Sequence, residues 1–302
     1  MKPLVTIAIP AYKAGRLRGS IASALRQTYG NTEVVIVNDQ SPEDVDSVVR
    51  AFDDPRIRYF VNERNVGKGD PSRNWNECLR RARGEWFCLL CDDDQYAPTF
   101  VETLLRLAEQ HPECNVLRSR VRVVDGEGRE VSLYPESPEW ESLEDYMWDL
   151  YHSRRRQTIS EFMVRTQTMR EAGGYTPLPY AWGSDNLSIF RFARHGGIAS
   201  TPECLTTFCD SGANISSDAR DMDEKLVAFR QYIEQVRQIV EEMGFKRQNE
   251  LLPVIDAYYH RACVAHMAEA DHKALGNIVR NRRKLSVSSG DIARALLRRW
   301  RR

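Results

Sequence analysis

Short apolar runs alternate with helix-like segments from residue 1 to about 110, and this order limits what the chain can fold into. The runs at 33–38 and 86–91 are typical of strands buried in a parallel sheet, and the segments 4–10 and 56–61 are also predicted strands. Between them, apolar residues recur at helical spacing, as in Leu17, Ile21 and Leu25. Strand–helix–strand repetition predicts an α/β fold with a mainly parallel central sheet flanked by helices.

Further along the chain the pattern loosens but still predicts individual elements. Ser41 and Pro42 suit the N-cap and the first position of a helix. The turn Asp125-Gly126-Glu127-Gly128 predicts a hairpin within 116–131. The other patterns predict a strand over 159–164 and helices over 71–83, 98–111, 140–151, 185–193, 221–243 and 248–270.

Three consecutive aspartates, Asp92, Asp93 and Asp94, follow directly on the fourth apolar run. In open α/β sheets the ligand crevice lies beyond the carboxyl ends of the strands. Adjacent carboxylates repel one another unless a cation neutralises them, and such hard oxygen ligands suit Mg²⁺ or Mn²⁺. Mg²⁺ is usually shared between one or two carboxylates and substrate phosphates. The junction therefore predicts a metal–phosphate site, with a solvated acidic turn that caps the next helix as the alternative.

Another acidic residue, Asp39, closes the second predicted strand. Because adjacent parallel strands share one crevice, its carboxylate is expected to accept a hydrogen bond from a bound base, with a plain Asx turn as the alternative. Tyr12 follows the first strand beside it and is expected to stack on that base, with an exposed loop tyrosine as the alternative.

The order of the motifs in this first part of the chain resembles the beginning of the family-2 inverting glycosyltransferases. The resemblance implies a GT-A fold with a Rossmann-like nucleotide-binding half, a nucleotide-sugar donor and a divalent metal, Mg²⁺ or Mn²⁺, on the donor diphosphate. The motifs that carry it are Pro10-Ala11-Tyr12-Lys13, Glu33 to Ser41, Asn65-Val66-Gly67, Arg73-Asn74-Trp75-Asn76, Gly84-Glu85-Trp86 and Leu89 to Asp94.

The same resemblance assigns roles to particular positions. Asp39 is expected to contact the donor base, Arg73 a phosphate, and Asp94 or Asp93 the metal, with Asp92 or Asp93 near the ribose. Cys91 stands where the family often has the first aspartate of its Asp-x-Asp-Asp (DXD) motif. The full set expected to bind the nucleotide sugar is Pro10, Ala11, Tyr12, Asp39, Asn65, Gly67, Arg73, Asp92 and Asp93.

Asp185 opens the predicted helix 185–193, after Trp182-Gly183-Ser184. The family commonly has Glu-Asp at this place, and the resemblance makes Asp185 the catalytic base. Inverting transfer needs one carboxylate to take the proton of the acceptor hydroxyl as it attacks the anomeric carbon. The alternative is a plain helix N-cap or a first-turn acid.

The family also places an Arg-x-His ahead of an Asn-x-Ser, and that histidine can complete the metal shell. Here Asn214-Ile215-Ser216 is present, but the expected pair falls near Cys209 and Ser211. Asp210 or Asp218 is the candidate substitute, and His195 is expected to be a helix C-terminal residue.

Charge is unevenly distributed although the formal net charge is zero. Residues 273–302 hold ten Lys/Arg and one acid, Asp291, so this segment is +9 and the rest is −9. Ile292, Leu296 and Trp300 recur at i, i+4 and i+8, which predicts a basic amphipathic helix suited to an anionic membrane surface. A solvated charge run or an oligomer contact is the alternative. Nucleic-acid binding is not expected, because no basic–aromatic platform appears elsewhere.

Cysteines and hydropathy indicate the compartment. Seven cysteines with no repeated metal-ligand spacing suggest a reducing environment, and we expect Cys88 and Cys91 to be core residues. No run approaches ~18 apolar residues, and 4–9 is too short for a signal sequence. We expect a cytoplasmic protein, peripheral on the inner face of the membrane.

The predicted division is a GT-A domain over 1–215, with a nucleotide-sugar-binding half (1–115) and an acceptor-binding half (116–215), and a helical C-terminal extension over 216–302. The predicted activity is metal-dependent hexosyl or related transfer, from a donor expected to be UDP-linked to a glycan or lipid-linked acceptor hydroxyl, in cell-surface polysaccharide synthesis. The alternatives are a catalytically silent binding protein of the same fold and a sugar-phosphate nucleotidyltransferase. A dehydrogenase is disfavoured, since no G-x-G-x-x-G follows a strand.

Overall fold

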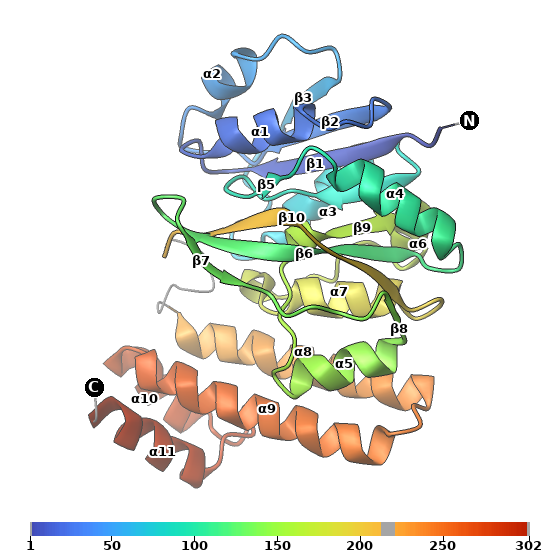
Figure 1. The fold of residues 1–302 in the computed structure, drawn as a ribbon. Helices are drawn as coiled ribbons and strands as arrows, with labels where there is room; N and C mark the ends of the chain where they lie inside the picture. The colour runs from blue at the N-terminus through green and yellow to red at the C-terminus, as the bar shows by residue number, and fades with distance from the viewer. Residues whose placement is uncertain (1, 213–220, 301–302) are drawn as a thin grey trace.

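One large sheet organises the protein. The computed structural model describes residues 2–212 and 221–300, and ten strands within them join in the order β3-β2-β1-β4-β9-β6-β10-β5, with β7 paired to β6 and β8 to β10 (Figure 1). The strands are β1 (Val5–Ala11), β2 (Thr32–Asn38), β3 (Ile57–Val61), β4 (Trp86–Leu89), β5 (Gln95–Tyr96), β6 (Val116–Asp125), β7 (Glu130–Leu133), β8 (Trp140–Glu141), β9 (Phe162–Arg165) and β10 (Ile198–Asp210).

Helices flank the sheet and extend below it in the view of Figure 1. They are α1 (Leu17–Leu25), α2 (Val45–Arg50), α3 (Ser72–Arg81), α4 (Phe100–Gln110), α5 (Leu143–Tyr151), α6 (Thr166–Glu171), α7 (Ser184–Phe192), α8 (Met222–Met243), α9 (Gln248–Glu269), α10 (His272–Arg280) and α11 (Ser289–Trp300). Short 3-10 turns lie at Ile159–Glu161 and Pro179–Ala181. None of the helices in the described ranges is long and apolar enough to cross a membrane.

The first half of the sheet is parallel, as the alternating pattern predicted. β1 pairs with β2 and β4, and β2 pairs with β3, all in parallel, whereas β9 runs antiparallel to β4 and β6. Parallel pairing brings the carboxyl ends of β1, β2 and β4 to one edge. The predicted α/β fold with a central sheet, flanking helices and a helical C-terminal region is confirmed.

Each face of the sheet has its own hydrophobic core. On β2, Val34 and Ile36 face the core shared with α1 and α4, while Val35 and Val37 face the core shared with α3, α5 and α7. This alternation follows from the period of two along a strand. Since both faces are covered, the strand has to be apolar throughout, which is the pattern seen in the sequence.

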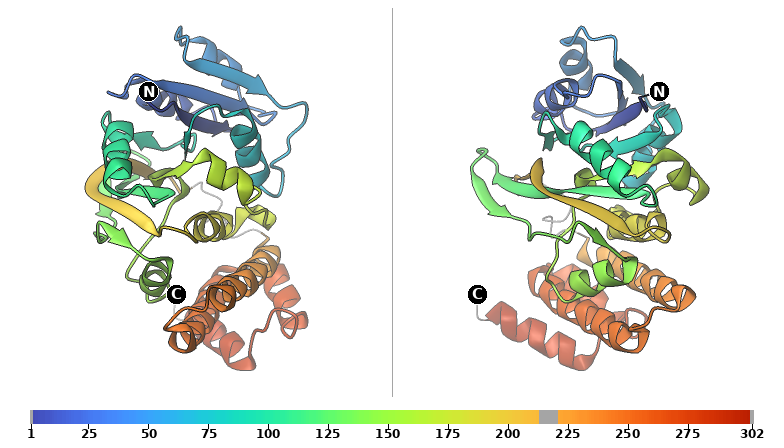
Figure 2. Two further views of the ribbon diagram at one scale, coloured as in Figure 1. Left: turned by 90° about the vertical axis from the view of Figure 1, so that its right-hand side faces the viewer. Right: turned by 45° about the vertical axis from the view of Figure 1, so that its right-hand side comes forward.

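The C-terminal helices share the second of these cores with the sheet. Tyr232 and Ile233 of α8 and Ile255 of α9 belong to the same buried cluster as Phe190 of α7 and Phe87 of β4. Figure 2 shows these helices stacked against the rest of the molecule. The predicted division at 215 and 216 falls outside the described residues and stays a prediction.

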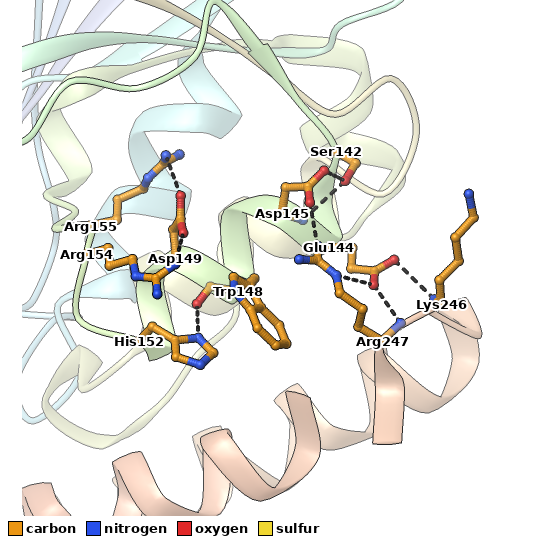
Figure 3. Close-up of polar contacts among 10 residues, drawn as sticks. All are labelled: Ser142, Glu144, Asp145, Trp148, Asp149, His152, Arg154, Arg155, Lys246 and Arg247. Atoms are coloured by element: carbon orange, nitrogen blue, oxygen red, sulfur yellow. Dashed lines mark hydrogen bonds and ion pairs between the residues drawn. The ribbon is translucent and has the colours of Figure 1, made fainter. Parts of the chain in front are cut away.

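Polar contacts tie α5 to the chain that joins α8 and α9 (Figure 3). Glu144 accepts hydrogen bonds from the backbone N–H of Arg247 at 2.7 Å and from its Nε at 3.0 Å. The guanidinium of Arg247 also pairs with Asp145 and lies 4.5 Å from the ring of Trp148. The beginning of α9 is therefore anchored to α5 by both charge and ring contacts.

Three predicted boundaries are wrong for local reasons. The helix predicted over 140–151 begins only at Leu143, because Trp140 and Glu141 pair with β10 as β8 and Ser142 caps α5. Ser41 is not an N-cap, because its Oγ donates to the carbonyl of Tyr12 at 2.5 Å; α2 begins at Val45, and Asp44 caps it by accepting from the N–H of Ser47 at 3.0 Å. The strand predicted over 159–164 begins only at Phe162, since the preceding residues form a 3-10 turn.

Replacing Ile233 by Ala tests whether the C-terminal helices are an integral part of the fold. Ile233 is fully buried in the shared core, so the cavity left behind should lower the free energy of unfolding by about 2–4 kcal/mol. Denaturant unfolding followed by tryptophan fluorescence measures this. Val131→Ala on β7, where the side chain is 62% exposed, should change it by less than about 0.5 kcal/mol. Equal effects of the two changes would contradict a shared core.

Candidate active site

A cavity of about 820 Å³ lies beyond the carboxyl ends of β1, β2 and β4, a size that suits a ligand as large as a nucleotide. Its walls come from the loops after these strands, from the segment around 180–186, and from α8 and α9. It brings together most of the site residues that the sequence predicted, namely Pro10, Tyr12, Asp39, Asn65, Gly67, Asp92, Asp93, Asp94 and Asp185.

Two predicted site residues do not line the cavity. Ala11 is fully buried in the core on the α1 side of the sheet. Arg73 points into solvent, with 64% of its side chain exposed, and its Nε lies 3.4 Å from Asp70. The cationic side chains among the lining residues are instead Lys13, which follows β1, and Lys68, on the loop before α3.

The chain holds Asp92 and Asp94 by hydrogen bonds. Asp92 Oδ2 accepts from the backbone N–H groups of Tyr12 at 2.8 Å and Lys13 at 2.6 Å. Asp94 Oδ1 accepts from the N–H of Cys209 at 3.0 Å, and its Oδ2 accepts from the Oγ of Ser160 at 2.6 Å. Donors from three distant segments therefore converge on the end of β4.

These hydrogen bonds leave part of the negative charge uncompensated. Burial, reinforced by the charge of Asp93, raises the pKa of Asp92 to about 6 and that of Asp94 to about 8. Asp93 itself is paired with Lys13 Nζ at 3.5 Å. A buried group of like charges with such raised pKa values favours the approach of a cation.

The donor set fits a divalent cation that is shared with a phosphate ligand. Within residues 2–212 and 221–300, no group of three or more His, Cys, Asp or Glu could hold a metal ion by itself. A cation bound by one or two carboxylates and completed by phosphate oxygens does not need such a group. Asp93 and Asp94 meet that requirement.

The residues near the expected metal-binding histidine, and those predicted to replace it, do not form one cluster in the described part of the chain. Cys209 reaches Asp94 through its backbone N–H. Asp210 is exposed and accepts from the N–H of Gly212 at 3.4 Å. His195 is not among the cavity residues. Asp218 and the motif Asn214-Ile215-Ser216 lie outside the described residues.

Asp39 organises the loop that carries Asn65 and Gly67. Its carboxylate accepts from the N–H groups of Val66 at 2.8 Å and Gly67 at 2.7 Å, and from Asn62 Nδ2 at 2.7 Å. A Cβ at position 67 would lie 2.7 Å from Asp39 Oδ2, so glycine permits this close approach. Asp39 also lines the cavity, and its contact with a base remains a prediction.

Asp185 lies in the first turn of α7, on the wall built by the segment 180–186. Gly183 occupies the N-cap position with a φ of +86°, and a Cβ there would lie 2.7 Å from the ring of Tyr232. Asp185 is therefore not the N-cap. Burial raises the pKa of Asp185 to about 6, although the backbone N–H of Asn186 opposes the shift. Such a carboxyl is ionised at neutral pH and able to accept a proton.

Apart from Tyr12 and Asn65, the sequence did not predict the aromatic and amide residues of the cavity. Phe229 and Tyr232 of α8, Tyr258 of α9 and Gln157 carry no motif, and in the sequence the aromatic ones are indistinguishable from ordinary helix core. Cys91, expected in the core, also lines the cavity. The full set missed is Lys13, Lys68, Gly69, Pro71, Asn74, Trp75, Cys91, Tyr134, Gln157, Thr158, Ile159, Tyr180, Ala181, Trp182, Gly183, Asn186, Phe208, Phe229, Tyr232 and Tyr258.

The free energy of unfolding should depend on pH because burial raises the pKa of Asp94. Its pKa of 3.8 in the unfolded chain rises to about 8 in the folded one, so protonation favours the folded state. The wild-type protein, compared with Asp94→Asn, should lose stability as the pH rises from about 4 to 8. Thermal unfolding of both proteins in chelator measures the difference, and a constant difference across this range would contradict the raised pKa.

Comparison with protein families and curated sequences gives a consistent match. The model of the family described as "Glycosyl transferase family 2" matches residues 6–172. The putative colanic acid biosynthesis glycosyl transferase WcaA of Escherichia coli is 33% identical over 143 residues, which cover 45% of this chain and 50% of that protein. The GalNAc(5)-diNAcBac-PP-undecaprenol beta-1,3-glucosyltransferase of Campylobacter jejuni is 32% identical over 111 residues, 36% of this chain and 35% of that protein. The matched segments thus cover half or less of these relatives.

Solved structures of similar fold cover nearly the whole chain. S. aureus TarS 1–349 in complex with UDP-GlcNAc aligns with a TM-score of 0.64 at 16% identity, over 98% of this chain and 89% of that one. Mannosyltransferase PcManGT from Pyrobaculum calidifontis, in complex with GDP-Man and Mn²⁺, aligns with a TM-score of 0.58 at 14% identity, over 99% and 88%. At these identities the likeness shows the fold, which is of the GT-A type.

Proposed function

The chain belongs to glycosyl transferase family 2, and from that premise we propose that it transfers a sugar from a nucleotide-sugar donor to an acceptor hydroxyl with inversion at the anomeric carbon. One observation carries the proposal. A single cavity combines an acidic strand end, Asp92 to Asp94, with a separately held carboxyl, Asp185, whose pKa burial raises to about 6. The first can meet a cation and a diphosphate, and the second can accept a proton.

The donor occupies the side of the cavity next to the strand ends. Pro10, Tyr12 and Asp39 surround the nucleoside, with Asn65 and Gly67 on the adjacent loop. We propose a UDP-linked sugar, supported by the UDP-GlcNAc that TarS binds. GDP-Man in PcManGT is a second nucleotide sugar known for this fold, so a donor panel has to include both bases.

The diphosphate is held by charge on two sides. Asp93 and Asp94 are the residues that would hold Mg²⁺ or Mn²⁺, and a bound cation there neutralises charge on the leaving diphosphate. The Mn²⁺ in PcManGT supports this assignment. Lys13 and Lys68, which line the cavity, contact the phosphate oxygens directly in place of Arg73.

Asp185 acts as the general base. It takes the proton from the acceptor hydroxyl as that oxygen forms its bond to the anomeric carbon, while the electron pair of the broken bond leaves with the nucleoside diphosphate. A single displacement of this kind inverts the anomeric configuration, and no covalent intermediate is needed. Burial keeps the pKa of Asp185 near 6, high enough for effective proton transfer and low enough for ionisation at pH 7.

The acceptor is a glycan or a lipid-linked saccharide used in polysaccharide synthesis. The names of two relatives, one in colanic acid biosynthesis and one acting on an undecaprenol-linked glycan, support this class. The aromatic residues Trp182, Phe229 and Tyr258 line the cavity and offer rings against which the C–H face of a pyranose can pack.

The decisive experiment compares the wild type with Asp185→Asn. Donors of UDP and GDP type are tested for transfer to a panel of octyl glycosides, with Mn²⁺, Mg²⁺ or chelator present. Asp185→Asn should lower kcat by a factor of about 10²–10⁴ because no group accepts the proton, while the donor Kd stays within about twofold. Wild-type kcat should fall as the pH drops through about 6, since Asp185 becomes protonated.

The matched control is Asp210→Asn, which removes an exposed carboxylate outside the cavity. It should leave kcat and its pH profile unchanged. Turnover by Asp185→Asn at the wild-type rate would eliminate Asp185 as the base. Absence of transfer by the wild type with every donor, although donors bind, would favour the silent binding protein.

Measurements of donor binding show whether the lysines or Arg73 contact the phosphates. Lys68→Met should weaken UDP binding about tenfold, the effect of removing one charge-assisted hydrogen bond. Arg73→Met removes an equal charge from the solvent side of α3, where Arg73 is 64% exposed, and should change the Kd by less than twofold. Calorimetry at fixed ionic strength measures both. If Arg73→Met weakens UDP binding more than Lys68→Met does, the phosphate contact belongs to Arg73 and not to Lys68.

A further inference from the structure

The last helix, α11, buries one face and exposes an apolar one. Asp291 and Ala295 are fully buried, and Asp291 Oδ2 lies 2.9 Å from His260 Nδ1 of α9. On the outward side, Leu296 is 48%, Leu297 57% and Trp300 86% exposed. The sequence placed Ile292 in the same stripe as Leu296 and Trp300, which is wrong, because Ile292 packs against the core.

Helical spacing makes these outward side chains continuous. At 100° per residue, positions 296, 297 and 300 fall within about 100° of one another and opposite the buried positions 291 and 295. Surface helices normally present polar residues on the face that points away from the core. An exposed stripe of two leucines and a tryptophan therefore indicates a surface that binds a membrane or another molecule.

The part of the chain that carries this stripe is basic. Exposed cationic residues lie on α11 (Arg294 and Arg298), on the turn before it (Arg283 and Lys284) and at the end of α10 (Arg280). Asp291, the only acid between residues 273 and 302, is buried and pairs with Arg294 at 2.6 Å. We call Leu296, Leu297, Trp300 and these basic residues the α11 face. The exposed charged residues within 273–300 are all cationic, and the exposed acids Glu269 and Asp271 border this face where Arg299 bonds to the carbonyl of Ala270.

We propose that the α11 face docks on a lipid bilayer that contains anionic phospholipids. Leucine and tryptophan side chains enter the boundary between headgroups and acyl chains, and arginine and lysine attract the anionic headgroups. The same charge opposes a second copy of this chain as the occupant, because two α11 faces would bring like charges together. This inference goes beyond the transfer reaction and does not depend on it.

The position of the α11 face suits an enzyme with a membrane-bound substrate. In Figure 1 the C-terminal end of α11 lies on the same side of the molecule as the carboxyl end of β1, the sheet edge beside the cavity. Docking through Trp300 would thus bring the side of the molecule that carries the cavity toward the bilayer surface.

Vesicle co-sedimentation of the full chain tests the proposal. Vesicles of phosphatidylcholine with about a quarter phosphatidylglycerol should retain the protein, pure phosphatidylcholine should retain much less, and binding should weaken as salt increases. The triple variant Leu296→Ser, Leu297→Ser, Trp300→Ser should weaken binding about tenfold or more. The control Val131→Ser, Leu133→Ser removes exposed apolar side chains from β7 and should bind as the wild type does.

A second variant separates charge from apolar contact. Arg283→Gln, Lys284→Gln, Arg298→Gln keeps the apolar stripe and should reduce binding to the anionic vesicles about tenfold or more, with an unchanged midpoint of thermal unfolding as the check on folding. Equal retention on neutral and anionic vesicles would overturn the proposal. So would failure to bind vesicles, in particular together with a dimer in analytical ultracentrifugation that the triple serine variant dissociates.

Discussion

The negative charge enclosed at the end of β4 is the constraint on which the site depends. Asp94 is almost fully buried, and its two oxygens are met by the hydroxyl of Ser160 and the N–H of Cys209. Asp92 in turn binds the backbone just after β1. The loops around the cavity are thus arranged by hydrogen bonds to these carboxylates, yet burial still raises the pKa of Asp94 to about 8. The raised pKa shows that the enclosed carboxyls are poorly compensated, which suits a cation, and a phosphate ligand would bind through that cation and not to the carboxylates themselves.

The second carboxyl of the cavity depends on the C-terminal helices. The ring of Tyr232 packs so closely against Gly183 that no side chain fits at that position, and Gly183 sets the beginning of α7, where Asp185 lies. Tyr232 is itself held by a hydrogen bond of 2.6 Å between its hydroxyl and that of Tyr151 on α5. α8 therefore shapes the cavity wall that carries Asp185 as well as covering the core.

Short-range signals predicted the elements and the strand-end acids, because an apolar run and the residue that follows it are neighbours in the chain. What depended on distant contacts was not predictable. Arg73 matched a motif by letter, but its side chain turns to Asp70 and solvent, and nothing in the sequence indicates that Lys68 lines the cavity. Ser41 had the composition of an N-cap and lost that role to a contact with Tyr12. The aromatic side chains of α8 and α9 that line the cavity come together only when these helices pack against the rest of the fold.

The charge asymmetry of the chain links the α11 face to the cavity in physical terms. The segment after residue 272 carries +9 and the remainder −9, so the molecule has a large dipole in spite of its zero net charge. Near an anionic surface, such a dipole turns the basic end toward the surface and the acidic part away from it, within about one Debye length of 8–10 Å. If the α11 face docks on a bilayer as proposed, this orientation would precede insertion of Leu296, Leu297 and Trp300. For the proposed lipid-linked acceptor such an orientation would matter, because a substrate anchored in a bilayer can approach the cavity from one side only.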